Sequence, residues 1–324
     1  MVPKELIDFL KKEDTFLIAT HFSPDGDALG SAIALSMALR QIGKKTVLLD
    51  KDPVPHAYSF LPGCKEFITI EKFAGHGLTD FVNLVLVDCN DLDRVTSNKS
   101  QISSLKFQTS AVIDHHASAK PFGDIKWVRP ETAATGMMVF HIIKELGVKI
   151  TSDMAINLYT AIAVDTGNFR HENTTPDALR IAAELAEAGA RPNEISRELF
   201  DSWSEGRFRL FIEVLNTLEI IDNIAMMTIT QKMFEETSTA SDDTETFVEY
   251  PRLIKNIGIS VLFREIDDNS YKISLRSKGH LNVAHVAEAF DGGGHKNAAG
   301  CRIKADLETA KTELLKKLKG TTAR

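Results

Sequence analysis

Aspartate and histidine residues recur at four places in the first half of the sequence. They are His21, Asp25 and Asp27 in the segment HFSPDGD, then Asp88, then the triplet Asp114-His115-His116, and finally Asp165. Carboxylates and imidazoles without thiolates favour Mn²⁺ or Mg²⁺ over a cysteine-bound zinc ion. A carboxylate between two such ions, as we interpret Asp88, can bridge metals about 3.5–4 Å apart and help to generate hydroxide for in-line attack on phosphorus. The pattern indicates two-metal hydrolysis of a phosphate ester.

Each of these pieces has a common structural explanation when it is taken alone. Asp25-Gly26-Asp27 is typical of a turn, Asp88 of a helix cap, and a single histidine of the surface or the core. On an extended loop, however, Asp25 and Asp27 would project to the same side, with Gly26 permitting a sharp backbone path. Several such side chains in one cleft would be costly unless cations compensate their charge, so their co-occurrence favours a metal site.

A glycine-rich segment near the C-terminus forms a second group. Gly292, Gly293 and Gly294 are followed by His295 and Lys296, and Arg276 and Lys278 precede them. Glycines let backbone N–H groups approach an anion closely, and the basic side chains add positive charge. The segment therefore predicts a phosphate or nucleotide cradle. From the glycines alone, a flexible loop that closes a hairpin is an equally good interpretation.

The elements around the first group predict a parallel sheet. Strands are expected at residues 16–20, 46–49, 84–88 and 111–114, and helices at residues 28–42, 132–146 and 153–164. This alternation is typical of an α/β domain with helices on both faces of the sheet. Ligands bind at the carboxyl ends of such strands, so we expect the acid and imidazole residues to share one pocket.

A second, smaller α+β domain is expected after Asp222. Before it, Thr175 is a plausible N-cap with Pro176 in the first helical turn, and residues 177–221 form a charged helical stretch. Strands are then expected at residues 224–230, 258–266, 271–277 and 300–304, with a hairpin turn at Asp267-Asp268-Asn269, helices at 282–290 and 306–318, and a glycine loop at 291–294. We therefore predict a catalytic domain at 1–190, a helical connector at 191–222 and a substrate-binding domain at 223–324.

The overall composition limits the possible partners. The 324 residues, 43% of them hydrophobic, suffice for two domains. The net charge of -7 argues against a basic groove for long duplex nucleic acid but permits a short substrate. Cys64, Cys89 and Cys301 have no CxxC spacing, which fits a reducing cytoplasm. No apolar run is long enough for a signal core or a bilayer span, so we expect no membrane association.

Taken in order, these residues resemble the signatures of the DHH phosphoesterase family. The matching segments are His21-x-x-x-Asp25-x-Asp27-Ala28, the strand-end Asp88, the literal triplet Asp114-His115-His116, and Ala163-Val164-Asp165-Thr166-Gly167. Arg276-Ser277 and the Gly-Gly-Gly-His295 segment resemble the DHH-associated domain of one branch of the family. The resemblance covers nearly the whole chain. Asp291 stands where close relatives often have another glycine, which weakens the expected anion binding at that position.

The resemblance implies a role for each residue. One Mn²⁺ would take His21, Asp25 and Asp88, and the other would take Asp27, Asp88, His115 and Asp165, with Mg²⁺ or Co²⁺ as possible substitutes. Asp114 would orient its neighbours, and His116 would contact the scissile phosphate, where it could act as a general acid. The other phosphate or the nucleotide end of the substrate would be held by Arg276, Ser277, Gly292, Gly293, Gly294 and His295.

Within the family, the compact arrangement resembles the group of oligoribonucleases, or nanoRNases, that are also 3′-phosphoadenosine 5′-phosphate phosphatases. RecJ-type exonucleases are much larger, and the manganese pyrophosphatases carry a different second domain. The resemblance implies hydrolysis of RNA of about two to five nucleotides, which needs few phosphate contacts. A cyclic-dinucleotide or linear-dinucleotide phosphodiesterase and a non-catalytic nucleotide-binding module remain alternatives. A homodimer is compatible with the sequence, which does not define the oligomeric state.

Overall fold

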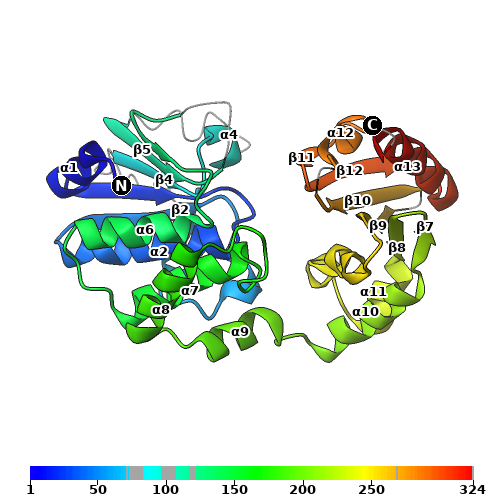
Figure 1. Cartoon of the computed structure of the whole chain (residues 1–324), viewed down its shortest axis with the longest axis horizontal. Coiled ribbons are helices and arrows are strands. Elements are labelled where there is room, and N and C mark those ends of the chain that lie inside the picture. Colours follow the sequence, from blue (N-terminus) through cyan, green and yellow to red (C-terminus); the bar gives the residue numbers. More distant parts are fainter. Residues whose placement is uncertain are drawn as a thin grey trace. The chain divides into compact units, whose positions relative to one another are not determined.

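The computed structural model describes residues 1–70, 72, 83–95, 107–116, 122–267, 269–279 and 281–322 (Figure 1). The chain divides into two compact units, Met1–Ser202 and Trp203–Arg324. The division falls within the predicted connector at 191–222, and the limits of that connector stay a prediction. Asp268, in the predicted hairpin turn, lies outside the described residues. Within the described part of the chain, no helix combines the length and the apolar character needed to cross a membrane.

The first unit contains a six-stranded parallel sheet, which confirms the predicted fold class. Its strands, in the order β3-β2-β1-β4-β5-β6, are β3 Phe67–Thr69, β2 Lys45–Asp50, β1 Thr15–Ala19, β4 Asn83–Val87, β5 Thr109–Asp114 and β6 Ile125–Val128. β1 and β4 are neighbours although β2 and β3 lie between them in the sequence. Strand order reverses at this pair, and the carboxyl ends of such a pair form a crevice in open α/β sheets.

Most of the described helices cover one face of this sheet, and the short helix α4 lies on the other (Figure 1). One core joins the sheet to α1 Lys4–Lys12, α2 Gly26–Gln41, α6 Thr135–Glu145, α7 Ser152–Asp165 and α8 Pro176–Glu187, and α9 Pro192–Phe200 follows. On the opposite face, a smaller core includes α4 Leu92–Val95. The predicted cap of α8 is present, since the Thr175 side chain accepts a hydrogen bond from the backbone N–H of Ala178 at 3.2 Å. α1, β3 and β6 were not among the expected elements.

A close approach of α2 and α7 brings two of the predicted metal ligands together. A Cβ atom at Gly30 would lie 2.3 Å from the carbonyl oxygen of Asn157, and one at Gly26 would lie 2.6 Å from Val164. Only glycine therefore fits at these two contacts. The tight packing places the start of α2, which carries Asp27, beside the end of α7, which carries Asp165.

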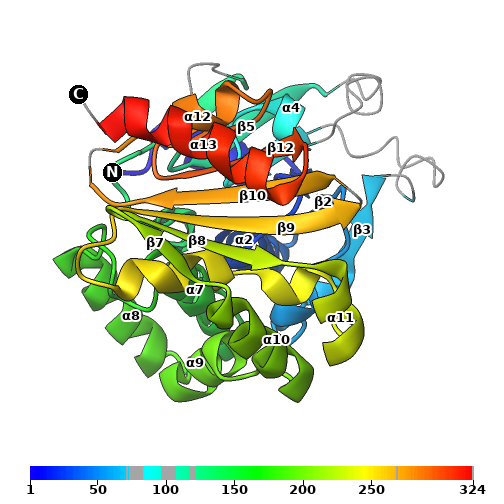
Figure 2. The same ribbon diagram turned by 90° about the vertical axis from the view of Figure 1, so that its right-hand side faces the viewer.

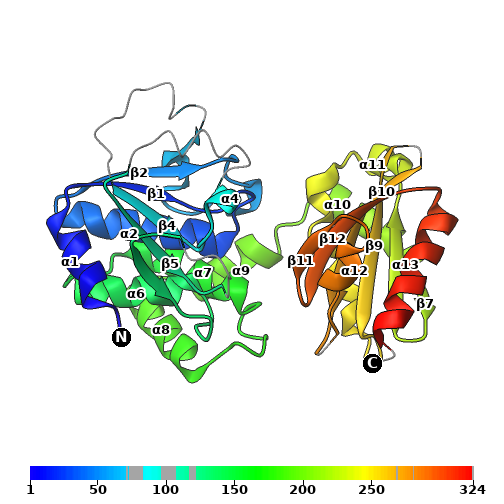
Figure 3. The ribbon, with the colours of Figure 1, turned by 90° about the horizontal axis from the view of Figure 1, so that it is seen from above.

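The second unit contains a mixed six-stranded sheet, which confirms the predicted α+β domain. Its order β11-β12-β10-β9-β8-β7 joins β11 Gly293–His295, β12 Ala298–Lys304, β10 Ser270–Ser277, β9 Ile259–Asp267, β8 Ile224–Ile229 and β7 Glu219–Ile221. β9 and β10 form the predicted hairpin (Figure 2). α12 Ala284–Glu288 and α13 Leu307–Thr322 share a core with this sheet, and α13 lies along one of its faces (Figure 3).

The opposite face of this second sheet packs against other helices. Its core includes residues of α10 Glu205–Asn216, α11 Gln231–Thr237 and the 3₁₀ helix Phe247–Leu253, and a second 3₁₀ helix spans Ser241–Thr244. The sequence predicted a loop at the glycine segment, but part of it is a strand, because Gly293–His295 pairs with β12. β7 is a second departure, since a helical stretch was predicted to continue to residue 221.

Candidate metal and phosphate site

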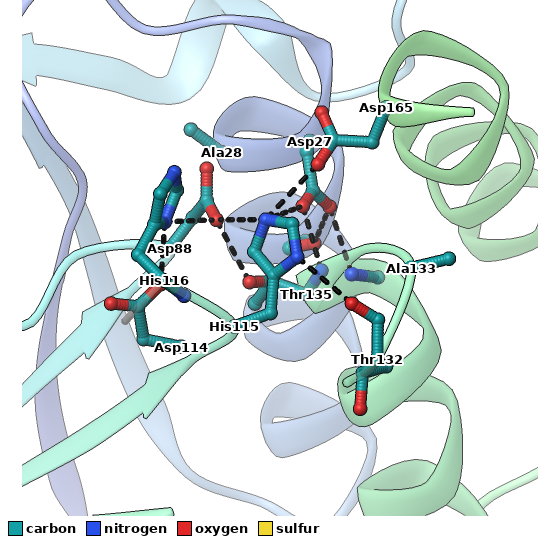
Figure 4. A network of polar contacts seen from close by, with 12 residues as sticks. Asp27, Ala28, Asp88, Asp114, His115, His116, Thr132, Ala133, Thr135 and Asp165 are labelled. Carbon is teal, nitrogen blue, oxygen red and sulfur yellow. Dashed lines mark hydrogen bonds and ion pairs between the residues drawn. The ribbon is translucent and has the colours of Figure 1, made fainter. Parts of the chain in front are cut away.

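Predicted metal ligands lie close together at the carboxyl ends of three adjacent strands, and Figure 4 shows Asp27, Asp88, His115 and Asp165 among them. His21 follows β1, Asp88 follows β4, and Asp114 ends β5 just before His115 and His116. Asp165 is the last residue of α7 and points into the same group. The structure thus brings the strand-end residues into one cluster, as the parallel-sheet pattern predicted.

Asp25 and Asp27 occupy the start of a helix and not the extended loop that the sequence predicted. α2 begins at Gly26, and Asp25 is its N-cap. One Asp25 oxygen accepts hydrogen bonds from the backbone N–H groups of Asp27 and Ala28, both at 3.0 Å. Asp25 itself is extended, and its capping hydrogen bonds satisfy donors that the start of α2 leaves unpaired. Gly26 has no left-handed backbone, and its lack of a side chain serves the contact with α7.

His115 lies at the centre of the cluster. Its Nε2 atom is 3.0 Å from Asp165 Oδ2, 3.5 Å from Asp88 Oδ1 and 3.6 Å from Asp27 Oδ2. Its Nδ1 atom lies 3.1 Å from the carbonyl oxygen of Thr132. A hydrogen bond from Nδ1 to that carbonyl leaves Nε2 as the atom that would bind a cation.

Asp88 lies between the two ligand histidines. It is 1% exposed, and its Oδ2 atom is 3.5 Å from His21 Nε2. His21 Nδ1 in turn lies 3.0 Å from the Phe22 carbonyl oxygen. In His21, as in His115, Nε2 is therefore the nitrogen that faces the carboxylates. Asp88 has a left-handed backbone, with a φ of 58°, and is not the helix cap that was the alternative interpretation. Asp88 can therefore face both histidines from the end of β4.

Three groups of side chains have ligand atoms that all lie within 4.8 Å of one another. They are His21, Asp25 and Asp88; then Asp27, His115 and Asp165; and then Asp88, His115 and His116. The first two groups contain all six residues expected to bind metal, and Asp88 belongs to the first and the third group. Hard oxygen donors with one imidazole in each of these two sets suit a divalent cation such as Mn²⁺. Metal binding by these residues stays a prediction.

The electrostatics of the cluster fit a bound cation. Burial and the charges of Asp88 and Asp165 raise the pKa of Asp27 well above its ordinary value. Burial also raises the pKa of Asp165. Although burial lowers the pKa of His21, the hydrogen bond to Asp88 and the nearby carboxylates outweigh it and raise that pKa to about 9. The buried carboxylates are thus costly to charge together, and a divalent cation could compensate their charge.

Asp27 is held by backbone and side-chain groups that the sequence did not identify. Its Oδ2 atom accepts a hydrogen bond from the Thr135 N–H at 2.6 Å, and its Oδ1 atom accepts from the Gly136 N–H at 2.8 Å and the Ser31 hydroxyl at 3.0 Å. The Thr135 hydroxyl also donates to Asp88 Oδ1 at 2.8 Å. The start of α6 therefore fixes two carboxylates. The only sequence signal for it was a Thr-Gly pair before a helical pattern.

His116 and Asp114 form a pair at the edge of the cluster. His116 Nδ1 lies 2.8 Å from Asp114 Oδ1, which also accepts the backbone N–H of His116 at 3.1 Å. Asp114 is fully buried, whereas the His116 side chain is 27% exposed, more than that of His21 or His115. Asp114 thus orients the imidazole, and His116 is placed to meet a ligand from solvent.

The expected phosphate-binding residues lie on β10 and β11 of the second unit. Arg276 Nε donates to Glu249 Oε1 at 2.6 Å. Ser277 is fully buried, and its hydroxyl donates to the Leu281 carbonyl at 2.7 Å, so it fixes the chain beside Arg276. Its contact with a substrate stays a prediction. The side chain of His295 lies outside the described part of the structure.

The glycines of this segment differ in how closely they are packed. A Cβ atom at Gly292 would lie 2.3 Å from the Gly300 carbonyl oxygen, and one at Gly294 would lie 2.5 Å from that of Ala298, so both permit close strand packing. At Gly293, which pairs with Gly300, a Cβ atom would meet nothing within 4 Å, so close packing does not require a glycine there. Asp291 has a φ of 54°, a left-handed conformation that explains why a glycine would also suit this position.

Two family models match the chain. The DHH family N-terminal domain matches residues 15–162, and the DHHA1 domain matches residues 223–323. A relative from Thermus thermophilus, named "Bifunctional oligoribonuclease and PAP phosphatase NrnA", is 35% identical over 94% of this chain and 89% of its own length. The protein of the same name from Bacillus subtilis is 29% identical over 94% of this chain and 97% of its own length.

Solved structures show the same architecture. An exopolyphosphatase-related protein from Bacteroides fragilis superposes with a TM-score of 0.92 at 28% identity, covering 98% of this chain and 95% of that protein. RecJ from Thermus thermophilus in complex with Mn²⁺ shares the fold at a TM-score of 0.58 and 13% identity, covering 99% of this chain and 54% of that protein. Together with the family models and the convergence of the strand-end residues, these likenesses show that the chain belongs to the DHH phosphoesterase family, with an N-terminal DHH domain and a DHHA1 domain.

Proposed function

We propose that this chain is a manganese-dependent hydrolase that degrades short oligoribonucleotides to mononucleotides and removes a phosphate from 3′-phosphoadenosine 5′-phosphate. The observation that carries the proposal is that two sets of possible ligands lie close together, with Asp88 in the first set and its Oδ1 atom 3.5 Å from His115 Nε2 of the second. The names of the Thermus thermophilus and Bacillus subtilis relatives support the two substrates. The structure of RecJ with Mn²⁺ supports the choice of metal.

The six predicted ligands would bind two ions. His21, Asp25 and Asp88 would hold one ion, and Asp27, Asp88, His115 and Asp165 would hold the other. When bound, such a pair of ions polarises the phosphoryl group and activates water. The backbone N–H groups of Thr135 and Gly136 fix the Asp27 carboxylate, so little reorganisation is needed when a cation binds. Asp88 would be shared between the two ions.

His116 is the residue that would handle the proton of the leaving group. Its Nδ1 atom faces Asp114, so Nε2 is the atom that would meet the phosphate. Protonated at Nε2, His116 can donate to the leaving oxygen as the bond to phosphorus breaks. Asp114 keeps the ring in this orientation and stabilises its positive charge.

The second unit would hold the other end of the substrate. Arg276 on β10 would supply positive charge, and the backbone of the neighbouring glycine segment would supply N–H groups to an anion. We assign catalysis to residues 1–190 and substrate holding to residues 223–324, with 191–222 as the connector. The buried, unpaired thiols of Cys64, Cys89 and Cys301 agree with a site of action in the reducing cytoplasm.

A chromatographic time course tests this function. The purified protein with Mn²⁺ is incubated in parallel with a ribodinucleotide, 3′-phosphoadenosine 5′-phosphate and cyclic di-AMP. We expect mononucleotides from the first and release of inorganic phosphate from the second, both abolished by a chelator. Selective cleavage of cyclic di-AMP would favour a cyclic-dinucleotide phosphodiesterase instead. Silence on all three by a protein that still binds Mn²⁺ would overturn the substrate assignment.

A further inference from the structure

Three basic side chains form a row across the second sheet. Arg264 on β9 pairs with Lys272 on β10, and Lys272 also pairs with Arg302 on β12. Residues directly opposite each other on neighbouring strands project from the same face of a sheet. The three side chains therefore lie side by side, and we call them the basic row.

The basic row shares its face with Arg276. Tyr271, Ile273 and Leu275 belong to the core that includes α12 and α13, so the alternating residues Lys272 and Arg276 project from the opposite face of β10. They are four positions apart in the strand, which is about 13 Å at roughly 3.3 Å per residue. A strand of stacked nucleotides covers this distance in about four steps of roughly 3.4 Å, and an unstacked strand in fewer.

Within the described part of the chain, no close ion pair cancels the charges of the basic row. Among the residues that the structure describes, none of its three members has a carboxylate oxygen within the 4.0 Å of a salt bridge, whereas Arg276 is 2.6 Å from Glu249. Like charges directly opposite on neighbouring strands destabilise a sheet. Partial burial and the charges of Arg264 and Arg302 accordingly lower the pKa of Lys272, with Glu245 and Asp242 acting in the other direction. A bound anion would relieve this repulsion.

A depression adjoins one end of the basic row. It has a volume of about 340 Å³, and its lining includes Arg264, Ser241, Gln231 and Glu265. Arg264 Nη1 donates to the Ser241 carbonyl at 3.1 Å, which fixes this end of the row. Lys272 and Arg302 are exposed. An anionic ligand could therefore reach Lys272 and Arg302 from solvent.

We propose that the basic row is a second phosphate-binding subsite, which holds the internucleotide phosphates of a single-stranded oligonucleotide whose end is bound near Arg276. The inference rests on the proposed function, since it takes Arg276 and the glycine segment as the site for a nucleotide. A substrate with one or two nucleotides cannot reach from Arg276 to Lys272, whereas one of about five can. The row would thus favour the longer members of the short-oligonucleotide class.

The test compares substrates of different length. The double variant Lys272→Gln and Arg302→Gln removes two charges from exposed strand positions and leaves Arg264, which bonds to the backbone, in place. With Mn²⁺ present, we expect the KM for a ribopentanucleotide to rise about tenfold, with a shallower dependence on salt concentration because fewer phosphates are neutralised. For 3′-phosphoadenosine 5′-phosphate and a ribodinucleotide, kcat and KM should stay within about twofold of the original values. The matched control, Lys316→Gln with Lys317→Gln, removes the same charge from α13.

A binding measurement separates this inference from the proposed function. Fluorescence anisotropy of a labelled ribopentanucleotide, recorded without metal, reports the subsite even if the protein hydrolyses none of the substrates. We expect weaker binding by the Lys272 and Arg302 double variant than by the control. Equal binding by the two, or an equal loss of activity on all three substrates in a variant with an unchanged melting temperature, would overturn the subsite.

Discussion

His115 Nε2 lies 3.0 Å from Asp165 Oδ2, although 49 residues separate the two in the sequence (165 less 115, less one). The contact joins the end of β5 to the end of α7 and closes one of the two ligand sets. Burial raises the pKa of Asp165. Burial lowers the pKa of His115, but the hydrogen bond to Asp165 and the nearby carboxylates outweigh it and raise that pKa to about 10. This pair is therefore the most direct point at which to test the metal site.

Replacing Asp165 by Ala should remove catalysis without unfolding the protein. The second ligand set loses one of its oxygen donors, so we expect turnover to fall by at least about a hundredfold and the affinity for Mn²⁺ to fall by at least about tenfold. Isothermal titration calorimetry measures the affinity, and circular dichroism checks the fold. The exposed Asp8→Ala variant on α1 is the control. Full turnover by purified Asp165→Ala protein would exclude the two-metal mechanism.

Metal removal should lower the stability of the first unit. A cation that binds the folded chain at about a hundred times its Kd stabilises that state by about 2.7 kcal/mol. Mn²⁺ should therefore raise the melting temperature, and a chelator should reverse the rise. In Asp88→Asn the effect should be much smaller, because Asp88 faces both ligand sets. Differential scanning calorimetry measures the melting temperatures. If Mn²⁺ raises the melting temperature of Asp88→Asn as much as that of the original protein, Asp88 is not shared between two ions.

Asp52 should influence metal affinity although it is no ligand. Its Oδ2 atom accepts a hydrogen bond from the Ser23 N–H at 2.8 Å, and Ser23 holds a left-handed φ of 53° between His21 and Asp25. Loss of this bond in Asp52→Ala should loosen the loop and weaken Mn²⁺ binding by about tenfold, the range seen when groups that orient ligands are removed. Asp52→Asn keeps an acceptor oxygen and should restore most of the affinity. Equal affinities in calorimetry for both variants and the original protein would refute this role.

Gly30→Ala should destabilise the first unit. The added Cβ atom would lie 2.3 Å from the backbone oxygen of Asn157, and α2 and α7 would have to separate. Overpacking of this kind costs about 1–3 kcal/mol in the free energy of unfolding. Urea denaturation measures it, with Gly293→Ala as a matched change at an open position. If Gly30→Ala unfolds at the same urea concentration as the original chain, the two helices do not meet as closely as described.

The stability of the metal-free protein should depend on pH through Asp50. Burial raises the pKa of Asp50 to about 6. The hydrogen bonds from the Thr20 hydroxyl and the Asp52 backbone N–H, together with the charge of His21, lower this pKa but do not outweigh burial. The folded chain thus binds more protons than the unfolded chain between about pH 4 and 6, so stability falls as pH rises through this window. Two pKa units correspond to about 3 kcal/mol. Asp50→Asn should lack this pH-dependent part of the stability. The difference in the free energy of unfolding between the two proteins, measured by urea denaturation, should therefore be constant above about pH 7. A constant difference from pH 4 to 7 would contradict the raised pKa.

Much of the site could be predicted because its side chains follow the ends of strands. The β-branched runs before His21, Asp88 and Asp114 define parallel strands, and the carboxyl ends of such strands meet at one edge of a sheet. The Asp-His-His triplet and the Asp-x-Asp pair supply ligand types that an ordinary turn does not need. The fold class, the family and the membership of the cluster therefore follow from residue types and from their positions along the chain.

The arrangement of the donors around Asp27 was decided only by the tertiary structure. The backbone N–H groups of Thr135 and Gly136 hold its carboxylate across more than a hundred residues of sequence. Every residue except proline has such a group, so residue identity cannot reveal which ones serve a site. The sequence also could not reveal β11. Its glycines are typical of a loop, but they pair with β12, and at Gly294 the chain approaches that strand too closely for a side chain. The sequence determined which ligands gather at the sheet edge, while the packing of α2, α6 and α7 decided how those ligands are held.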